Sequence, residues 1–392
     1  MTVTGGPSGA AAERHIPLAE PALNGNEARY LAECVRSNYV SSVGPFVERF
    51  ETAFAERLAS PHAVACSSGT AALHVALRLA GVERGDVVAV SDFTFIASAN
   101  AVRYLGAEPL LVDSDAHTWN LHSERLHDHV EDLARRGQSL PAAIVAVHVL
   151  GQPADLEPLL SLRERFAIPI VEDAAEALGA SVVPPNGHER AVGTVGDLGC
   201  FSFNGNKIIT SGGGGMIVTP SDTLAARAKH LTTQAKVGGR EYVHDTVGYN
   251  YRLTNVAAAL GLAQLEQIET FLDAKAEIAR RYDLAFSDQP IRRPGRLPGS
   301  RPSEWLYSLL LDPDRADRDR VLDRLARQGI GARPLWTPLH RQAPYASSPR
   351  VGTGETADDL HRRGLSLPCS VTLSPGDQNL VIRAVEQAIA SA

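Results

Sequence analysis

Lysine is scarce in this chain. Of the 38 lysine and arginine residues, only four are lysine, namely Lys207, Lys229, Lys236 and Lys275. Arginine supplies nearly every cation, but its guanidinium stays protonated and cannot serve as a free amine. A lysine retained inside a glycine-rich turn, as Lys207 is, therefore indicates that a primary amine is needed there.

Other shortages exclude whole classes of protein. A formal net charge of −7 without a basic stripe excludes a mainly electrostatic nucleic-acid binder. No uninterrupted apolar run reaches membrane-spanning length, so we expect no membrane partner. The four cysteines are scattered without a CxxC pair, which predicts reduced core thiols in a cytoplasmic protein and no metal site. The N-terminal stretch MTVTGGPSGAAAE lacks the regions of a signal peptide, and we expect residues 1–14 to form a disordered tail.

Short apolar runs alternate with amphipathic patterns through the first two thirds of the chain. Because β-branched runs between helices are typical of buried parallel strands, the pattern predicts an α/β fold with a mostly parallel central sheet covered by helices. The predicted strands lie within 62–66, 86–90, 108–115, 142–151 and 168–180, and the predicted helices within 45–59, 67–81 and 96–106.

The pattern changes near residue 250. One long helical stretch covers 255–286, and a Pro/Arg/Gly-rich loop follows it. The stretches 304–312, 317–335 and 376–390 then together indicate a smaller α+β unit. We therefore predict a large domain at 15–255 and a smaller C-terminal α+β domain at 256–392.

Three stretches place polar residues where parallel strands end, which is where open α/β sheets bind ligands. In CSSGTAALH, the amides of Gly69 and Thr70 begin a helix and are suited to an anion, although Ser-Gly-Thr is also a common helix cap. In VEDAAEA, Asp173 follows a strand; it caps a helix or holds a cationic ring nitrogen.

The third stretch is GCFSFNGNKIITSGGGGMIVT, residues 199–219. Its glycines precede a strand, whereas a dinucleotide fingerprint needs a strand, glycines and then a helix, and the Walker spacing is absent. Lys207 is then either a solvated loop cation or a reactive amine, with Ser202 nearby in sequence. A phosphate cradle, an acid for a pyridinium nitrogen and a lysine for a Schiff base together fit pyridoxal phosphate.

These stretches resemble the DegT/DnrJ/StrS family of nucleotide-sugar aminotransferases. The likeness is carried by SSGTAALHVALRLAG, VEDAAEALGA, FSFNGNKIITSGGGGMIVT and GYNYRLTNVAAALGLAQLEQI, and it runs from about His15 to about residue 385. The resemblance implies the aspartate aminotransferase-like fold type I of pyridoxal 5'-phosphate enzymes and a homodimer with shared active sites. It also implies glutamate as the amino donor.

The resemblance implies roles for individual residues. Lys207 matches the Schiff-base lysine and Asp173 the partner of the pyridine nitrogen. The other implied cofactor contacts are Gly69, Thr70 and Ser202 for the phosphate, Phe95 stacked on the ring, Glu176 beside the ring hydroxyl, and Asn250 reaching the phosphate from the other subunit. Trp336 and His340 lie where relatives line the sugar pocket, and Arg252 either reaches a phosphate or pairs with surface acids.

On substrate, EDAAEA with FNGNKIITSGGGG looks most like the branch that aminates UDP-linked 4-keto-6-deoxy-N-acetylhexosamines. Alternatives are a 3- or 4-aminotransferase for GDP- or TDP-linked ketosugars, of perosamine or antibiotic-sugar type, and a non-catalytic regulatory protein that binds the cofactor. Sugar dehydratases of the family carry histidine in place of the lysine, so Lys207 disfavours that reaction.

Overall fold

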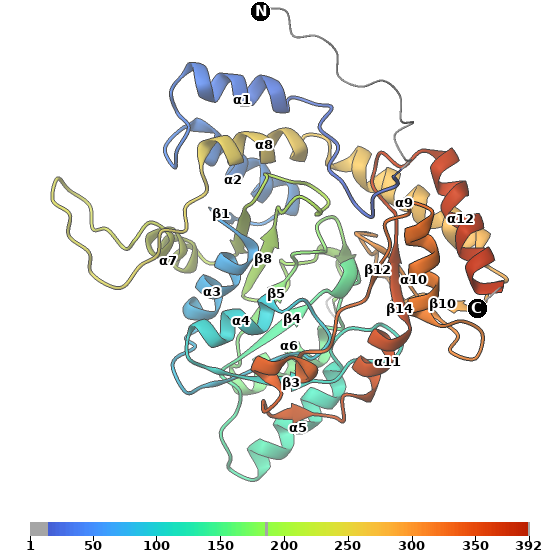
Figure 1. Ribbon diagram of the computed structural model, residues 1–392. Coiled ribbons are helices and arrows are strands. Elements are labelled where there is room, and N and C mark those ends of the chain that lie inside the picture. Colours follow the sequence, from blue (N-terminus) through green and yellow to red (C-terminus); the bar gives the residue numbers. More distant parts are fainter. Residues whose placement is uncertain (1–14, 185–186, 391–392) are drawn as a thin grey trace, which may run out of the picture.

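The computed structural model describes residues 15–184 and 187–390. The predicted tail at 1–14 lies outside the described residues. A large sheet with helices packed around it forms one part of the molecule, and a smaller sheet with its own helices lies beside it (Figure 1).

The large sheet has eight strands in the order β1-β9-β8-β5-β4-β2-β3-β13. The strands from β8 to β13 run parallel, whereas β9 is antiparallel to both β1 and β8. The prediction of a mostly parallel sheet is confirmed. The bounds are β1 His62–Cys66, β2 Val87–Ser91, β3 Glu108–Val112, β4 Ala143–Val147, β5 Ile170–Asp173, β8 Leu198–Ser202, β9 Gly215–Thr219 and β13 Arg350–Val351.

Helices cover this sheet with apolar faces that the sequence spacing dictates. In α2, Phe46, Phe50, Phe54 and Leu58 recur every four residues and are all buried. The Phe54 ring packs edge-on against Phe201 of β8 at 5.1 Å between ring centroids. The helices of this part are α1 Glu27–Arg36, α2 Pro45–Leu58, α3 Gly69–Leu79, α4 Ala97–Tyr104, α5 Ser123–Arg135, α6 Glu157–Phe166, α7 Asp222–Thr232 and α8 Asn255–Leu265.

The single long helix predicted over 255–286 is wrong, because the chain forms α8 and then a separate helix, α9 (Ile268–Ala285). The break at Glu266 and Gln267 brings two side-chain amides to one buried carboxylate. The Nε2 atoms of Gln264 and Gln267 donate to Glu27 at 2.6 and 3.0 Å. A continuous helical pattern does not reveal this tertiary contact.

The smaller part contains a four-stranded sheet in the order β10-β11-β14-β12. The chain leaves this part once to add β13 to the large sheet, so residues near 350 pack beside β3. Its elements are β10 Ile291–Arg292, β11 Tyr307–Leu311, α10 Arg318–Arg327, β12 Arg333–Pro334, α11 Glu355–Arg363, β14 Gly364–Leu367 and α12 Pro375–Ala390. Short elements complete the fold: η1 Val149–Gly151, β6 Ser181–Val182, β7 Arg190–Ala191, η2 Leu339–Arg341 and η3 Ala343–Tyr345.

The fold also bears on the predictions made for the cysteines and for membrane-spanning segments. All four cysteines are free and buried, which confirms them as core thiols. Within 15–184 and 187–390, none of the helices combines the length and apolar character needed to cross a bilayer.

Candidate active site

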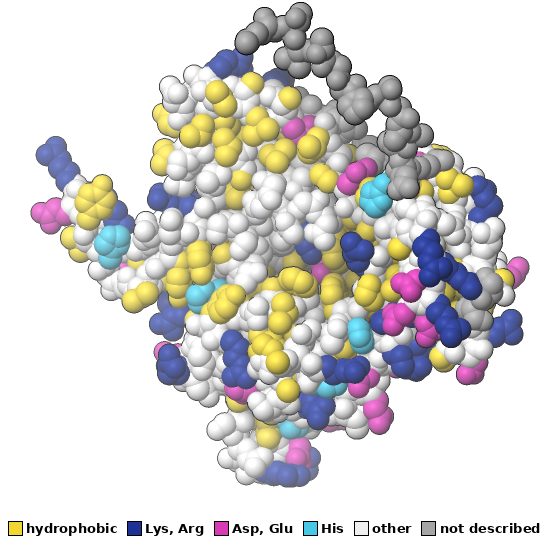
Figure 2. Space-filling model, in the orientation of Figure 1, with side chains coloured by type: hydrophobic (Ala, Val, Ile, Leu, Met, Phe, Trp, Pro, Cys, Tyr) yellow, Lys and Arg dark blue, Asp and Glu magenta, His cyan; other side chains and the backbone are white. Residues whose placement is uncertain are grey.

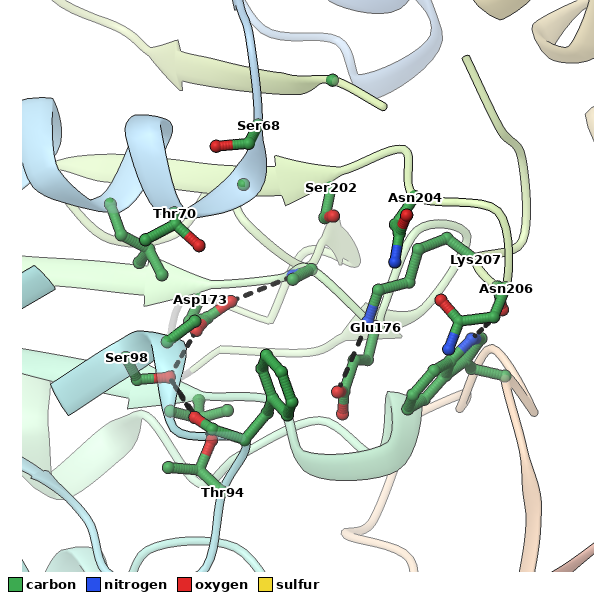
Figure 3. A pocket seen from close by; sticks show the side chains of 18 of the residues that line it. Ser68, Thr70, Thr94, Ser98, Asp173, Glu176, Ser202, Asn204, Asn206 and Lys207 are labelled. Carbon is green, nitrogen blue, oxygen red and sulfur yellow. Dashed lines mark hydrogen bonds and ion pairs between the residues drawn. The ribbon is translucent and has the colours of Figure 1, made fainter. Parts of the chain in front are cut away.

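A cavity of about 310 Å³ opens at the carboxyl ends of β5 and β8, beside the start of α3 (Figure 3). This is the edge at which parallel sheets bind ligands. Eight of the residues singled out in the sequence line it: Gly69, Thr70, Phe95, Asp173, Glu176, Ser202, Lys207 and Trp336.

One end of the cavity is built from the first turn of α3. Ser68 caps this helix, and its hydroxyl accepts from Ala71 N–H at 3.0 Å. The N–H groups of Gly69 and Thr70 have no partner within the helix and lie at its positive end. A Cβ added to Gly69 would lie 2.7 Å from the Ser202 Cβ, so the missing side chain brings these two segments together.

The glycine run before β9 shapes the same end. A Cβ on Gly215 would lie 2.4 Å from the Ser68 carbonyl oxygen, which only glycine avoids. Gly212 has a φ of +75°, a conformation that glycine adopts at little cost. The run therefore lets β9 approach the α3 turn closely, and Gly213 and Gly214 form with Thr70 and Ser202 the part of the cavity lining that we call the α3 recess.

Asp173 ends β5 and also lines the cavity. Its carboxylate accepts from the Ser98 hydroxyl at 2.7 Å and from Ala175 N–H at 3.2 Å. Burial raises its pKa, which the hydrogen bond from Ser98 partly offsets. A buried carboxylate that faces a cavity and lacks a full ion pair is suited to hold a cationic N–H of a ligand.

The neighbouring Glu172 has a different task. It is fully buried and accepts from the backbone N–H groups of Gly193, Val195 and Gly196 at 2.6–2.8 Å. His148 Nδ1 accepts from Ala154 N–H, so its Nε2 carries the proton and donates to Glu172 at 3.0 Å. Burial acts to raise the pKa of Glu172, but these hydrogen bonds lower it overall. Glu172 thus fixes the loop that follows β7, and of these two neighbouring acids only Asp173 faces the cavity.

Lys207 lies in the turn that follows β8, and its side chain is only 14% exposed. Its Nζ lies 3.5 Å from Glu176 Oε1 and 4.0 Å from the centroid of the Trp305 ring. The other carboxylate oxygen of Glu176 accepts from Leu150 N–H at 2.9 Å. Burial raises the pKa of Glu176 to about 7, although the nearby Lys207 opposes that shift. The amine is therefore held inside the cavity and is not a solvated loop cation.

Aromatic side chains form the walls of the cavity. Phe95 follows β2, is 55% exposed, and lies on the cavity wall. Trp305 and Trp336 come from the C-terminal part, with their ring centroids 6.5 Å apart and nearly parallel. Trp305 could not be predicted from the sequence, because nothing in EWLYSLLLD indicates which part of this run faces the lysine.

Other cavity residues were also missed, although a signal was present for two of them. Asn204 and Asn206 both precede Lys207 in FNGNK, and both line the cavity. Ser68, Thr94 and Ser98 complete the set of missed polar residues.

Three of the predicted residues lie outside the cavity lining. Asn250 is exposed at the base of the loop that projects from the body between α7 and α8 (Figure 1). Arg252 pairs with Cys66 through a backbone bridge, and its buried Nε has no partner among the described residues. His340 donates its backbone N–H to Asp92 at 2.9 Å and places Nδ1 2.5 Å from the same carboxylate. His340 therefore joins η2 to the end of β2.

The donor set fits pyridoxal phosphate. The recess at α3 offers helix N–H groups and hydroxyls to a phosphate, and Asp173 offers a carboxylate to a protonated ring nitrogen. Lys207 offers the amine that an aldehyde requires, and it lies in the same cavity. No group of three or more histidine, cysteine or acidic side chains suited to a metal occurs in the described part of the chain.

Comparisons with known proteins agree with this geometry. The DegT/DnrJ/EryC1/StrS aminotransferase family matches residues 21–386. GDP-perosamine synthase of Vibrio cholerae is 39% identical over 354 residues, which is 90% of this chain and 93% of that protein. GDP-perosamine synthase of Caulobacter vibrioides is 39% identical over 379 residues, 95% of this chain and 98% of that protein.

Solved structures show the same fold. The aminotransferase TlmJ from Streptoalloteichus hindustanus superposes with a TM-score of 0.86 at 31% identity, covering 96% of this chain and 99% of that one. A DegT DnrJ EryC1 StrS aminotransferase from Brucella abortus gives a TM-score of 0.85 at 30% identity, covering 93% and 95%. The chain belongs to the DegT/DnrJ/EryC1/StrS aminotransferase family and is a pyridoxal phosphate-dependent enzyme of fold type I.

Proposed function

We propose that this enzyme transfers an amino group from glutamate to the carbonyl carbon of a nucleotide-linked 4-keto-6-deoxy sugar. The observation that carries the proposal is the meeting of Lys207, Asp173 and the α3 recess in one cavity. When bound there, pyridoxal phosphate supplies an electron sink for the carbon that loses a proton.

Each lining residue has a distinct task in this proposal. Gly69, Thr70 and Ser202 hold the phosphate, and Phe95 covers one face of the ring. Asp173 holds the proton of the pyridine nitrogen, because a buried carboxylate favours a cationic partner.

Lys207 carries the cofactor and moves protons. Once the amino donor has displaced Lys207 from the cofactor, the free amine would accept a proton from the α-carbon of the donor and return one to the carbon that came from the cofactor's aldehyde. The enclosed position between Glu176 and Trp305 keeps the amine near the reacting atoms and limits its contact with water.

The names of the relatives bear on the choice of nucleotide. Two relatives at 39% identity are GDP-perosamine synthases, which favours a GDP-linked ketosugar over the UDP-linked N-acetylhexosamine expected from the sequence. We therefore place the GDP-linked sugar first and keep the UDP-linked sugar as the second candidate. The four buried free cysteines fit a cytoplasmic enzyme.

A homodimer with shared sites completes the proposal. Asn250 is exposed and outside the cavity of its own chain, so a second copy is the partner whose phosphate recess it serves. The projecting loop exposes large apolar side chains, with Tyr242 and Val247 exposed by 85% and 80%. Figure 2 shows hydrophobic side chains on this loop and on the face around α1 and α2, where Val35 and Val43 are exposed by 66% and 64%. Exposed apolar surface of this kind is typical of a protein interface.

The test is an assay of the purified enzyme with glutamate and a panel of GDP-, UDP- and TDP-linked 4-keto-6-deoxy sugars. We expect release of 2-oxoglutarate and an aminated sugar, identified by mass spectrometry, fastest with the GDP-linked substrate. Bleaching of the bound cofactor by glutamate without amination of any sugar would show that the acceptor is of another class. A cofactor that glutamate leaves unchanged would favour the non-catalytic regulatory protein.

A further inference from the structure

Lys275 is a buried cation without a counter-ion. It lies in α9 and is 5% exposed, and among the described residues no carboxylate forms an ion pair with it. Its ammonium donates to the carbonyl oxygens of Trp305 and Cys369 at 2.9 and 2.6 Å, and it lies 3.6 Å from Cys369 Sγ. Burying a charge against neutral acceptors is costly, and an apolar side chain would fill the same space without that cost. We infer that the ammonium of Lys275 is needed to hold the two carbonyl groups to which it donates.

Lys275 joins the ends of two strands. Trp305 lies just before β11 and Cys369 just after β14, and these strands are neighbours in the smaller sheet. Because one ammonium binds both carbonyl groups, it fixes the backbone of Trp305 relative to α9. The Cys369 thiol adds a hydrogen bond to the same Trp305 carbonyl at 3.5 Å.

The segment before Trp305 is fixed from the other side as well. Ser303 donates its N–H to the Gly151 carbonyl and its hydroxyl to the Glu176 carbonyl, both at 3.0 Å. Glu304 adopts a φ of +52°, which is uncommon for a residue with a side chain. A Cβ on Gly151 would lie 2.3 Å from Ser303 Oγ, so the two loops pack closely. These contacts direct the indole of Trp305 into the cavity.

The indole makes two contacts with the turn that carries the reactive amine. Its N–H donates to the Asn206 carbonyl at 2.7 Å, and its ring lies 4.0 Å from Lys207 Nζ. The first contact fixes the backbone beside Lys207, and the second places the face of the indole against the amine. Trp305 itself is 3% exposed, so this wall does not depend on ligand binding.

We propose that Trp305 holds the Lys207 amine in its reactive position, and that Lys275 is the positioning residue that holds Trp305 there. The inference rests on the proposed role of Lys207 as the residue that carries the cofactor. By this route the C-terminal part of the chain positions a residue in the turn after β8 of the large sheet. Preorganisation of this kind favours reaction because the amine needs no further ordering.

The test measures how fast the full-length enzyme reloads with pyridoxal phosphate after the cofactor is removed, followed by visible absorbance. Covalent loading joins the amine nitrogen to the aldehyde carbon and releases water, so its rate reports the readiness of Lys207. Visible circular dichroism of the loaded enzyme reports how rigidly the cofactor is held. Borohydride reduction and peptide mapping confirm that the cofactor is on Lys207.

Four variants separate the two roles. Trp305→Phe keeps an aromatic face but loses the indole N–H, and we expect loading to slow about fivefold. Trp305→Leu also loses the aromatic face, and loading should slow about tenfold to a hundredfold with a weaker dichroism signal. Lys275→Met should slow loading about threefold to tenfold, although it does not touch the cavity. The double variant Lys275→Met/Trp305→Leu should match Trp305→Leu within about twofold, because both changes act through the same indole.

Matched controls make the same chemical changes elsewhere. Lys229→Met removes a lysine that pairs with Glu51 at the surface, and Trp119→Phe alters a buried tryptophan outside the cavity. Both should load at the wild-type rate.

Several results would overturn the inference. Additive effects in the double variant would make Lys275 a stabilising residue only, and unchanged loading in Trp305→Leu would remove Trp305 from the proposal. If Lys275→Met does not fold, Trp305→Phe decides the question. Wild-type loading and dichroism in that variant would refute the proposal that Trp305 holds the Lys207 amine in position. None of these measurements uses a sugar, so a wrong acceptor class leaves them intact. A cofactor mapped to another lysine would instead refute the role of Lys207.

Discussion

Two residues with the same charge show how position decides chemistry in this enzyme. Lys229 pairs with Glu51 at the surface at 2.6 Å, whereas Lys207 is enclosed beside Glu176 and Trp305. An arginine at position 229 should leave activity unchanged, because any exposed cation can pair with Glu51. It cannot replace Lys207, because a guanidinium neither carries the cofactor nor accepts a proton.

The first prediction follows from this contrast. Lys207→Arg should lower turnover by about a thousandfold or more and remove the visible absorbance of the bound cofactor. Lys229→Arg, the same change at the surface, should keep wild-type turnover. Release of 2-oxoglutarate and the absorbance spectrum measure both. Near-normal turnover in Lys207→Arg would exclude this lysine as the cofactor carrier.

Glu176 gives a second prediction at the scale of one residue. Its pKa is raised from 4.5 to about 7, chiefly by burial, so the folded chain binds this proton more tightly than the unfolded chain does. Stability therefore falls as the pH rises from about 4.5 to about 7. Glutamine cannot ionise and is spared this loss. We expect Glu176→Gln without cofactor to be more stable than wild type by about 2 kcal/mol at about pH 8, and similar near pH 4.

Denaturant unfolding at the two pH values measures this difference. Lys207 loses its carboxylate partner in the variant, which works against the gain. A variant that is less stable than wild type at the higher pH would show that the pair with Lys207 outweighs the cost of burial. A gain confined to the higher pH is typical of a site that gives up stability for function.

At the scale of elements, the segment around Tyr251 packs against α3 and the turn that begins this helix. His74 of α3 lies 3.2 Å from the Tyr251 hydroxyl, and Ser67 N–H donates to the Tyr251 carbonyl at 2.8 Å. His74 also packs against the rings of Tyr104 and Tyr249. Burial lowers the pKa of His74, so the folded chain resists its protonation.

The sign of this shift sets the third prediction. As the pH falls below about 6.5, the unfolded chain gains a proton on His74 that the folded chain does not, and stability is lost. His74→Phe removes that group and keeps a ring among the tyrosines. Its free energy of unfolding should therefore decline less than that of wild type between about pH 7 and about pH 5.5. Parallel declines in the two proteins would contradict a neutral, buried His74.

For the molecule as a whole, the parts that could be predicted are those that neighbours in sequence decide. The order of strand, Lys207 turn, glycines and strand is local, and so is the position of Asp173 at a strand end. The glycine run is visible in the sequence, but the contact that requires it, between Gly215 and Ser68, joins distant segments.

Contacts between distant segments could not be predicted in the same way. Trp305 contacts Lys207, and its backbone carbonyl accepts from Lys275, although positions 207, 275 and 305 lie far apart in the sequence. The return of β13 to the large sheet and the break between α8 and α9 also depend on tertiary partners. His340 is of a residue type that often contacts ligands, but its ring lies against Asp92, outside the cavity lining.

The proposed dimer yields the last prediction at this scale. If Asn250 serves the recess of the partner chain, a heterodimer of Lys207→Ala and Asn250→Ala has one cavity with both changes and one with neither. We expect each variant homodimer to be strongly impaired and the heterodimer, purified with two different tags, to recover about half of the wild-type activity. A heterodimer of Lys207→Ala with Lys229→Ala should also give about half, because only one defect is then present. If Asn250 serves its own chain, every cavity of the first heterodimer carries one defect, and its activity will only equal the mean of the two impaired homodimers.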